Sequence, residues 1–377
     1  MSSIRLFFAG DFCSKPSTSL ITVSEELKDV IQSADVAVIG FEVPLKPDVS
    51  LPPQKYERFW QNDDAPGFLS NLGFNLFSIA NNHAFDWGEE GYRKTRRSLG
   101  DKAFGAGTYD EAYQVKTCVI DGVRIGFLGL SFAAYTGVFD DVFDHSGLGC
   151  AWIDDLKVNH IIVQAKKELD YLFVLPHDGI EYIDVPIPEV IARYRDFIDW
   201  GADGVIGSHP HCPQGWEDYK GKPIFYSLGN FFFNSKDNTS YRAWNRPHWY
   251  EGMCVEMVIS DGRIQYHIIN TKNIDNEQLV IDHQPARDRH NQELVFLLND
   301  KERYFDYLME KCRHLSLSQE MPIIDGTFHV ETLKTNTKKM LKNWIRVLKG
   351  KEISNDFSLR TFLRNGTRRS VLLRTLR

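Results

Sequence analysis

The sequence has 377 residues, of which 42% are hydrophobic and 25% charged, and its net charge is −7 at pH 7. This composition is typical of a globular chain with room for one large α/β domain or two ordinary ones. The acidic balance argues against a nucleic-acid partner, and without an apolar run of about 18 residues no transmembrane helix is expected. Six cysteines without paired spacing exclude a zinc ribbon and are typical of reduced thiols. Since the first apolar run is too short for a signal peptide, we expect a cytoplasmic protein.

Short apolar runs alternate with longer helical patterns along the chain, which predicts an α/β fold. The predicted strands cover residues 5–9, 35–41, 74–80, 114–120, 124–130, 171–176, 203–206, 224–228, 253–260 and 263–270. The predicted helices cover residues 25–33, 88–99, 155–169 and 188–200, and residues beyond about 285 look mostly helical. Ser24 is a predicted N-cap. Asp121-Gly122 and Asp261-Gly262 predict hairpin turns, so some strands should be antiparallel.

Polar residues that can bind a metal ion stand where several of these strands end. In chain order they are Asp11, Glu42, Asn82-His83, His177 and His209-Pro210-His211. Sites in open α/β sheets form at the carboxyl ends of strands, so we expect these side chains to converge. Each residue alone also fits an ordinary role, as a turn-capping acid or a hydrogen-bonded histidine. Together, oxygen and imidazole ligands without thiolate favour a hydrolytic two-metal site.

Six short motifs, taken in order, resemble those of the CapA family of bacterial capsule and poly-γ-glutamate synthesis proteins. They are GD at 10–11, FEVPL at 41–45, ANNHAFDWG at 80–88, HDGIE at 177–181, GSHPH at 207–211 and YSLGNF at 226–231. The resemblance covers about residues 4–270. It implies a calcineurin-like metallophosphatase fold, which is a four-layer α/β/β/α sandwich with mixed sheets. We therefore expect a metallophosphatase-like domain over residues 1–285 and a C-terminal helical extension over 286–377.

The resemblance also implies roles for individual residues. The implied metal ligands are Asp11, Glu42, Asn82, His177, His209 and His211, for one or two divalent ions of manganese, zinc or iron. His83 would protonate the leaving oxygen or orient the substrate, with Asp86 fixing its tautomer. The residues expected to line the substrate pocket are Glu181, which would also support His177, Gln214 and Glu217. Loop capping is an equally good reading of Asp86 and of these three residues.

At two positions this sequence differs from the motifs of related phosphatases or of the family. Related phosphatases carry a histidine two residues after the first aspartate, where this chain has Cys13. The resemblance implies that the CapA family shares this loss, so one metal site would be weaker or the centre would hold a single ion. Cys13 is better explained as a buried thiol than as a thiolate ligand. The family commonly has asparagine where this chain has Gly40, which leaves one polar contact of the pocket open.

Aromatic residues stand in predicted loops near the motifs, and a basic segment ends the chain. The aromatic residues are Trp60, Trp87, Trp216, Tyr241, Trp244 and Trp249, which suit either sugar stacking or ordinary packing. Residues 331–377 contain 13 Lys and Arg against three Asp and Glu, so they carry +10 and residues 1–330 carry −17. Their apolar residues recur close to helical spacing, which fits a membrane-surface anchor, a partner helix or a helical pair packed on the acidic body. We expect peripheral attachment at the inner face of the membrane through an anionic lipid surface.

The leading functional hypothesis is a metal-dependent hydrolase, specifically a phosphoesterase, in capsule, exopolysaccharide or poly-γ-glutamate synthesis. Its substrate would be a phosphorylated or anionic precursor of a cell-surface polymer. One alternative is a non-enzymatic scaffold or polymer-binding protein that retains the fold, which the loss of a histidine at Cys13 supports weakly. Another is amide-bond chemistry on poly-γ-glutamate, which only the family association suggests.

Overall fold

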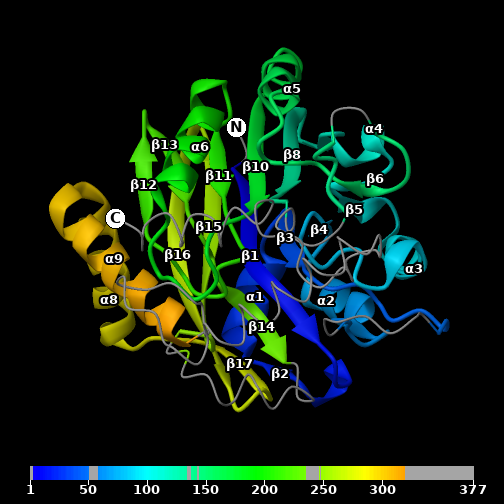
Figure 1. Ribbon diagram of the computed structural model, residues 1–377, viewed down its shortest axis with the longest axis horizontal. Coiled ribbons are helices and arrows are strands. Elements are labelled where there is room, and N and C mark those ends of the chain that lie inside the picture. The colour runs from blue at the N-terminus through cyan, green and yellow to red at the C-terminus, as the bar shows by residue number, and fades with distance from the viewer. Residues whose placement is uncertain are drawn as a thin grey trace, which may run out of the picture.

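The strands form two sheets that pack face to face between layers of helices (Figure 1). A computed structural model describes residues 3–50, 58–133, 137–141, 144–234, 246 and 248–318. The nine-stranded sheet runs in the order β2 (Thr22–Val23), β17 (Gln278–Ile281), β16 (Arg263–Ile274), β15 (Glu251–Ser260), β1 (Ile4–Ser14), β3 (Val36–Phe41), β4 (Leu76–Ser78) and β5 (Ala103–Phe104), with β14 (Asn230–Asn234) also paired to β1. The six-stranded sheet runs in the order β12 (Trp216–Tyr219), β13 (Lys222–Phe225), β11 (Gly204–Ile206), β10 (Tyr171–His177), β8 (Val123–Ser131) and β7 (Lys116–Ile120). A small pair is formed by β6 (Ala106–Gly107) and β9 (Gly149–Cys150).

Three apolar cores hold these layers together. Alternate residues of β1 point to opposite faces, so Leu6 and Phe8 face the second sheet while Phe7 faces helices. The central core joins the two sheets, for example through the tilted rings of Phe8 and Phe173, whose centroids lie 5.5 Å apart. One outer core lies under α1 (Glu25–Gln32), α2 (Ala65–Leu72) and α3 (Gly88–Leu99). The other lies under α4 (Tyr109–Ala112), α5 (Lys157–Ala165), α6 (Pro188–Asp199), α8 (Pro285–Asn299) and α9 (Lys301–Ser318). The expected four-layer sandwich with mixed sheets is confirmed.

Local signals that the sequence carries are present in the structure. The side chain of Ser24 accepts a hydrogen bond from the backbone N–H of Leu27 at 3.4 Å, and α1 begins at the next residue. Asp121 and Asp261 adopt a φ of 50°, and each is followed by a glycine that also has a positive φ. The strands on either side of each turn are antiparallel, as this turn chemistry favours. The predicted helix over 155–169 is shorter, since α5 ends at Ala165.

The first strand differs from its prediction in a way that matters for the site. The pattern predicted that it ends at residue 9, but β1 continues to Ser14. Asp11 therefore lies inside the strand, where the pairing with β3 shifts register between Ala9 and Asp11. Beyond that point β1 gains a parallel partner, β14, which the sequence analysis missed. This irregularity directs a carboxylate out of a buried strand.

The C-terminal helices α8 and α9 pack on the outer face of the six-stranded sheet, next to β12 (Figure 1). Leu294 and Leu308 are buried there, and the hydroxyl of Tyr304 donates to the carbonyl of Pro186 at 2.6 Å. The start of the predicted extension thus shares a core with the preceding residues, and the domain boundary at 285 stays a prediction. Among the described helices none is both long enough and apolar enough to cross a bilayer. The basic segment 331–377, Tyr241 and Trp244 lie outside the described residues.

Candidate metal centre

Side chains from both sheets meet at the ends of β3, β10 and β11 and at the irregular part of β1. His177, the last residue of β10, places Nδ1 3.5 Å from Oδ1 of Asp11. Its Nε2 lies 3.2 Å from Nδ1 of His209 and 4.0 Å from Oε1 of Glu42. His211 completes the group, with Nε2 3.5 Å from the same oxygen of Glu42. The structure therefore brings the predicted carboxylates and imidazoles into one cluster.

The two carboxylates of this cluster are buried, and three of their four oxygens have no hydrogen-bond partner among the described residues. Asp11 is 0% exposed and Glu42 is 1% exposed. Oδ1 of Asp11 and both carboxylate oxygens of Glu42 have no hydrogen-bond partner among the described residues. Unpaired buried carboxylate is strongly unfavourable, because a charge removed from water needs a partner. Unpaired oxygens surrounded by imidazole nitrogens fit one or two divalent cations.

The pKa shifts of the cluster without a metal ion also indicate that Glu42 needs a positive partner. Burial, followed by the charge of Asp11, raises the pKa of Glu42 well above its usual value. For Asp11, burial opposes ionisation, but the nearby His177 and the backbone N–H of His209 bring its pKa below the usual value. Burial and the other imidazoles lower the pKa of His209 well below normal, which keeps its ring neutral. Neutral imidazole and ionised carboxylate are the states that a metal ion requires of its ligands.

The HxH segment reaches the cluster through an unusual backbone. His209 and His211 have φ values of 98° and 56°, a region that residues other than glycine seldom occupy. The backbone N–H of His209 donates to Oδ2 of Asp11 at 2.9 Å, which ties this loop to β1. In an extended loop, two histidines separated by one residue would point to the same side. The structure reaches that result by strained backbone, which is common where geometry serves a site.

Asn82 and His83 follow β4 and occupy different places around the cluster. The side-chain oxygen of Asn82 lies 2.9 Å from Nε2 of His177. His83 is at the rim, with its side chain 14% exposed and its Nε2 4.0 Å from Glu42. Its Nδ1 lies 2.9 Å from Oδ2 of Asp86, as the prediction for this pair required. Burial opposes protonation of His83, but the carboxylate of Asp86 outweighs it and raises the pKa of the ring.

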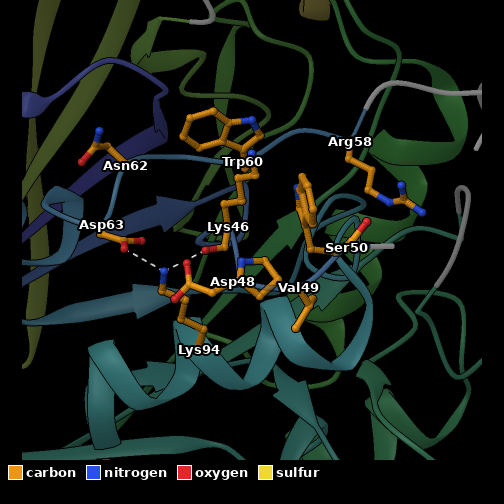
Figure 2. Close-up of a pocket in the computed structure, with 11 residues that line it drawn as sticks. Lys46, Asp48, Val49, Ser50, Arg58, Trp60, Asn62, Asp63 and Lys94 are labelled. Carbon is orange, nitrogen blue, oxygen red and sulfur yellow. Dashed lines mark hydrogen bonds and ion pairs between the residues drawn. The ribbon is translucent and has the colours of Figure 1, made fainter. Parts of the chain in front are cut away.

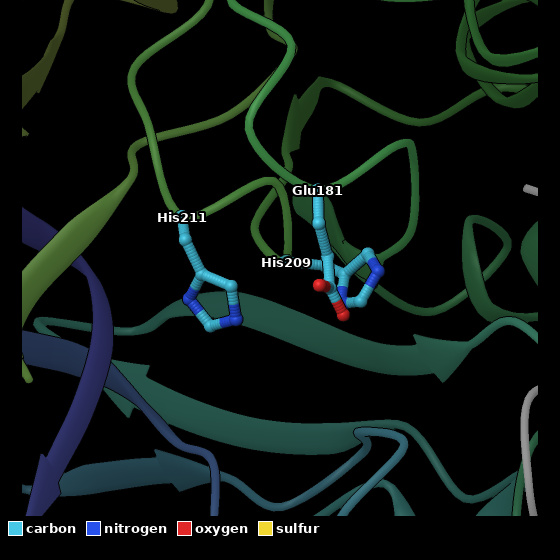
Figure 3. A group of neighbouring side chains, drawn as sticks. All are labelled: Glu181, His209 and His211. Atoms are coloured by element: carbon cyan, nitrogen blue, oxygen red, sulfur yellow. The ribbon is translucent and has the colours of Figure 1, made fainter. Parts of the chain in front are cut away.

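Glu181 is placed with the ligands, in a role different from the one expected. One of its carboxylate oxygens and a nitrogen each from His209 and His211 lie within 4.8 Å of one another (Figure 3). His177 is instead oriented by Ser208, whose hydroxyl oxygen lies 3.0 Å from Nδ1. The expectation that Glu181 supports His177 is therefore corrected. Glu181 faces the imidazoles of the HxH segment and is a further candidate ligand.

The structure does not bring Gln214 and Glu217 to the cluster as pocket-lining groups. The amide of Gln214 is buried and donates to the carbonyl of Ile183 at 2.8 Å, which fixes the loop after β10. Glu217 lies on β12, where its carboxylate accepts from Arg195 at 2.6 and 2.7 Å and from the hydroxyl of Tyr226 at 2.6 Å. These partners satisfy the carboxylate, so the role assigned to Glu217 has no support in the geometry.

Residues that the sequence analysis left without a role complete one wall of the centre. The side-chain oxygen of Asn230 lies 2.9 Å from Nδ1 of His211 and so orients that ring. Tyr182 stacks on His211 with centroids 6.1 Å apart, and Trp249 lies 5.0 Å from the same ring. Asn230 was within a quoted motif, whereas Tyr182 carried no signal beyond its place after Glu181. The wall is aromatic and shields the imidazole from water.

Cys13, which departs from related phosphatases, and Gly40, which departs from the family, both have structural explanations. Cys13 is 0% exposed and packs with Val43, Phe233 and Trp249. Burial and the charge of Glu42 raise its pKa well above the usual value, so it remains a thiol, which agrees with the packing interpretation. At Gly40 a Cβ atom would lie 2.6 Å from Oδ1 of Asp11. Glycine at this position therefore lets strands β1 and β3 approach each other at the carboxylate of Asp11.

A polar cavity of about 650 Å³ is lined by residues near Asp86 and Phe59 in the chain, and none of its lining residues belongs to the cluster. Lys46, Trp60 and Trp87 are among its lining residues, and the Lys46 ammonium lies 5.2 and 5.3 Å from the two indole rings (Figure 2). Phe59 joins the cavity to the site, since its ring lies 4.8 Å from His83 and its N–H donates to Asp86 at 2.9 Å. Arg58 and Trp60, which line the cavity, are therefore the chain neighbours of the ring that contacts His83. By contrast, Trp216 is a half-buried residue of the central core.

Comparison with known proteins identifies the family of this chain. The family described as "Bacterial capsule synthesis protein PGA_cap" matches residues 6–235. The chain belongs to this family. PGA biosynthesis protein CapA of Bacillus subtilis (strain 168) is 28% identical over 253 residues, which cover 66% of this chain and 61% of that protein. Capsule biosynthesis protein CapA of Bacillus anthracis is 33% identical over 171 residues, which cover 44% and 42%.

The alignments cover less than two thirds of these relatives' own lengths, so their activities are not transferred with the family. Among solved structures, a phosphatase from Mycoplasma pneumoniae covers 77% of this chain and 97% of its own, with a TM-score of 0.44 and 12% identity. A 5'-nucleotidase from Candida albicans SC5314 covers 70% and 50%, with a TM-score of 0.40 and 12% identity. Similarity at this level carries no conclusion about activity.

Proposed function

We propose that this chain is a metal-dependent phosphoesterase that acts in the synthesis of a capsule or a related cell-surface polymer. One observation carries the proposal. Three buried carboxylate oxygens of Asp11 and Glu42 lack a partner among the described residues and face the imidazoles of His177 and His211. A protein does not keep such oxygens unpaired without cost, and divalent cations are the partners that fit this donor set.

The protein's own residues divide into holding and reacting groups. Asp11, Glu42, His177, His209 and His211 would hold one or two cations, with Asn82 and Glu181 at the edge of the same set. Bound cations would supply Lewis acidity and neutralise charge on the phosphoryl oxygens. Asp11 contacts both the imidazole of His177 and the backbone N–H of His209, so it links these two ligand-bearing segments.

His83 is suited to handle a proton at the leaving oxygen. Its Nδ1 is held by Asp86, so Nε2 is the nitrogen that points toward the cluster. Because Asp86 raises the pKa of His83, the ring carries a proton at a higher pH than a free histidine does. Its side chain is 14% exposed, whereas those of His177 and His211 are 4% and 5% exposed. A rim position lets His83 touch a substrate that the buried ligands do not reach.

The polar cavity lined by Lys46 and Arg58 supports an anionic substrate. Lys46 is held between two indole rings, and Arg58, another lining residue, lies 5.7 Å from the ring of Trp87. The lining carries Lys46, Arg58 and Lys94 against Asp48 and Asp63, and Lys94 pairs with Asp63 at 2.7 Å, so the cavity has a net positive charge. A phosphorylated or carboxylated precursor chain matches this charge, in keeping with relatives named for capsule and PGA biosynthesis.

The experiment is metal analysis of the purified chain followed by assay with an aryl phosphate and a γ-glutamyl amide. We expect bound transition metal, phosphatase activity with Mn²⁺ or Zn²⁺, and no amide cleavage. His209→Ala should lose metal and activity. His267→Ala, a change at an exposed histidine of β16 outside the cluster, should keep both. Wild-type protein without metal and without activity after reconstitution would refute the proposal, and binding of an anionic polymer by that inactive protein would favour the scaffold alternative.

The basic segment 331–377 leads to a separate proposal about location. Its +10 charge and interleaved apolar residues suit an anionic lipid surface, which attracts each Lys or Arg with about 1 kcal/mol near the membrane. The full chain should co-sediment with phosphatidylserine vesicles at low salt, and a chain that ends at residue 318 should not. Equal sedimentation of the two chains would contradict a membrane role for this segment.

A further inference from the structure

A second group of ligand-type side chains lies outside the centre described above. Asp184 belongs to the loop between β10 and α6, His248 precedes β15, and His290 lies on α8. Nε2 of His248 and Nε2 of His290 lie 3.6 and 3.7 Å from Oδ2 of Asp184. One ligand atom from each residue lies within 4.8 Å of the other two. Three distant segments of the chain thus present nitrogen and oxygen atoms to one point.

These separations suit ligands of one ion better than partners in hydrogen bonds. Hydrogen bonds between nitrogen and oxygen are about 2.7–3.2 Å long, so 3.6 and 3.7 Å are too far. Bonds of about 2.0–2.2 Å to a tetrahedral ion place neighbouring ligand atoms about 3.3–3.6 Å apart, so the 3.6 Å distance fits this range and the 3.7 Å distance lies just above it. In addition, Oδ1 of Asp184 and Nε2 of His290 are buried with no hydrogen-bond partner in the part of the chain that the structure describes. The side chain of Asp184 is only 2% exposed, so water does not replace that partner readily.

Neighbouring residues orient these atoms as they do around known metal ions. Oε2 of Glu251 lies 2.7 Å from Nδ1 of His248, which fixes the proton there and leaves the Nε2 lone pair toward Asp184. Carboxylate–histidine–metal arrangements of this kind are the usual support of a zinc ligand. Tyr307 and Lys311 donate to Oδ2 of Asp184 at 2.8 and 3.2 Å, so the oxygen nearest the two imidazoles already has two donors, and Oδ1 is the oxygen that remains open.

The nearby positive charges do not prevent an ion from binding. Arg287 donates to the same oxygen of Glu251 at 2.6 Å, so the two charges cancel. The Lys311 side chain is 29% exposed and stands at the edge of the group. His248 and His290 stack with centroids 4.6 Å apart and an angle of 15° between their planes, an arrangement that favours two neutral rings over two charged ones. Burial, followed by the nearby His248, lowers the pKa of His290 in the same sense.

We propose that Asp184, His248 and His290 form a mononuclear site for a borderline-soft divalent ion such as Zn²⁺, separate from the centre at Asp11 and Glu42. Two imidazoles and one carboxylate are a common zinc ligand set that leaves a fourth position for water. The side chains of His248 and His290 are 21% and 24% exposed, so that position faces the solvent. The ion joins α8 to the loop after β10, the loop that also carries Glu181.

The test measures Zn²⁺ binding in a full chain whose first centre has been disabled. His209→Ala provides that background, and the probe is Zn²⁺ alone, followed by Co²⁺ as a spectroscopic substitute. We expect one remaining equivalent of Zn²⁺ and visible absorption from tetrahedral Co²⁺. Adding His290→Ala should remove that equivalent, and adding Glu251→Gln should weaken it about 10–100-fold. The matched control is His283→Ala, a histidine whose side chain is 70% exposed and pairs with Glu26, and it should leave binding unchanged.

Two outcomes would overturn the proposal. One is a His209→Ala chain that binds no more Zn²⁺ than the same chain with His290→Ala, with both folded by circular dichroism. The other is an equal loss in the His283→Ala control. If His209→Ala fails to fold, the wild-type chain is compared with His290→Ala, and an equal metal content again refutes the site. Since activity is not the readout, failure of the phosphoesterase proposal would not affect this result.

Discussion

Glu42 offers a sharp test of the metal centre, because its carboxylate should destabilise the protein without a metal and stabilise it with one. Its side chain is fully buried and its two oxygens have no hydrogen-bond partner among the described residues. In the metal-free protein, burial and then the charge of Asp11 raise its pKa well above 4.5. The folded state therefore binds the proton more tightly than the unfolded state does. The resulting stability is complete below the unfolded pKa and is lost as the pH rises through the folded pKa.

Replacing this carboxylate by an amide of equal size removes the charge and keeps the volume. Each pKa unit corresponds to about 1.4 kcal/mol, so metal-free Glu42→Gln at pH 8 should be about 1–3 kcal/mol more stable than metal-free wild type. At pH 4 the two should be close. With Mn²⁺ at a hundred times its dissociation constant, wild type gains about 2.7 kcal/mol while Glu42→Gln gains little, so the order reverses.

Urea unfolding, followed by circular dichroism with chelator or with Mn²⁺, measures both differences. The matched control is Glu217→Gln, whose carboxylate is paired with Arg195 and Tyr226 rather than left open. This control should lose about 1–3 kcal/mol with or without metal, because an amide loses the ion pair with Arg195 and accepts fewer of the hydrogen bonds that include the buried hydroxyl of Tyr226. The reasoning is refuted if Glu42→Gln destabilises the chelated protein at pH 8 as much as it destabilises the metal-loaded protein.

Three further changes test other parts of the structure. Asp86→Asn removes the charge that raises the pKa of His83, so the alkaline limb of phosphatase activity should move to lower pH, with about 10–100-fold lower kcat and unchanged metal content. An unmoved pH profile would assign Asp86 to loop capping alone. Gly10→Ala places a Cβ 1.9 Å from the carbonyl oxygen of Gly229, so thermal unfolding should show a loss of about 3 kcal/mol or more, and a loss below about 1 kcal/mol would contradict this close approach. Ser24→Ala removes the N-cap of α1 and should lower the free energy of unfolding in urea by about 1 kcal/mol, whereas no change would show that the cap is not needed.

The features that the sequence predicted well are those set by residues close together in the chain. Helix α1 begins after its serine cap, and the Asp-Gly turns join antiparallel strands, because the backbone chemistry of these positions is local. The ligand cluster was also predictable in large part. His177, for example, ends a strand whose continuous apolar run marks it as buried, so its position at a sheet edge follows from the pattern alone.

What the sequence could not supply are contacts between residues far apart in the chain. The contact between His209 and Asp11 joins residues 198 positions apart and depends on a register shift inside β1 that no residue pattern announces. Glu217 follows the HxH segment closely and was therefore expected in the pocket. Its direction depends on β12, whose pairing with β13 places it against Arg195 on α6. Proximity in sequence misled there because strand pairing, and not distance along the chain, sets where Glu217 lies.

The loop between β10 and α6 connects the metal centre to the C-terminal helices α8 and α9, because its residues contact both. Its residues Glu181 and Asp184 face in different directions, the first toward His209 and the second toward α8 and α9. Tyr304 of α9 holds the carbonyl of Pro186 in the same loop. Without these helices, the carboxylate of Asp184 would lose the hydroxyl donor of Tyr307, and the carbonyl of Pro186 would lose the hydroxyl donor of Tyr304. The position of Glu181 beside the imidazoles is thus set partly by residues that lie beyond the family's matched region, which ends at residue 235.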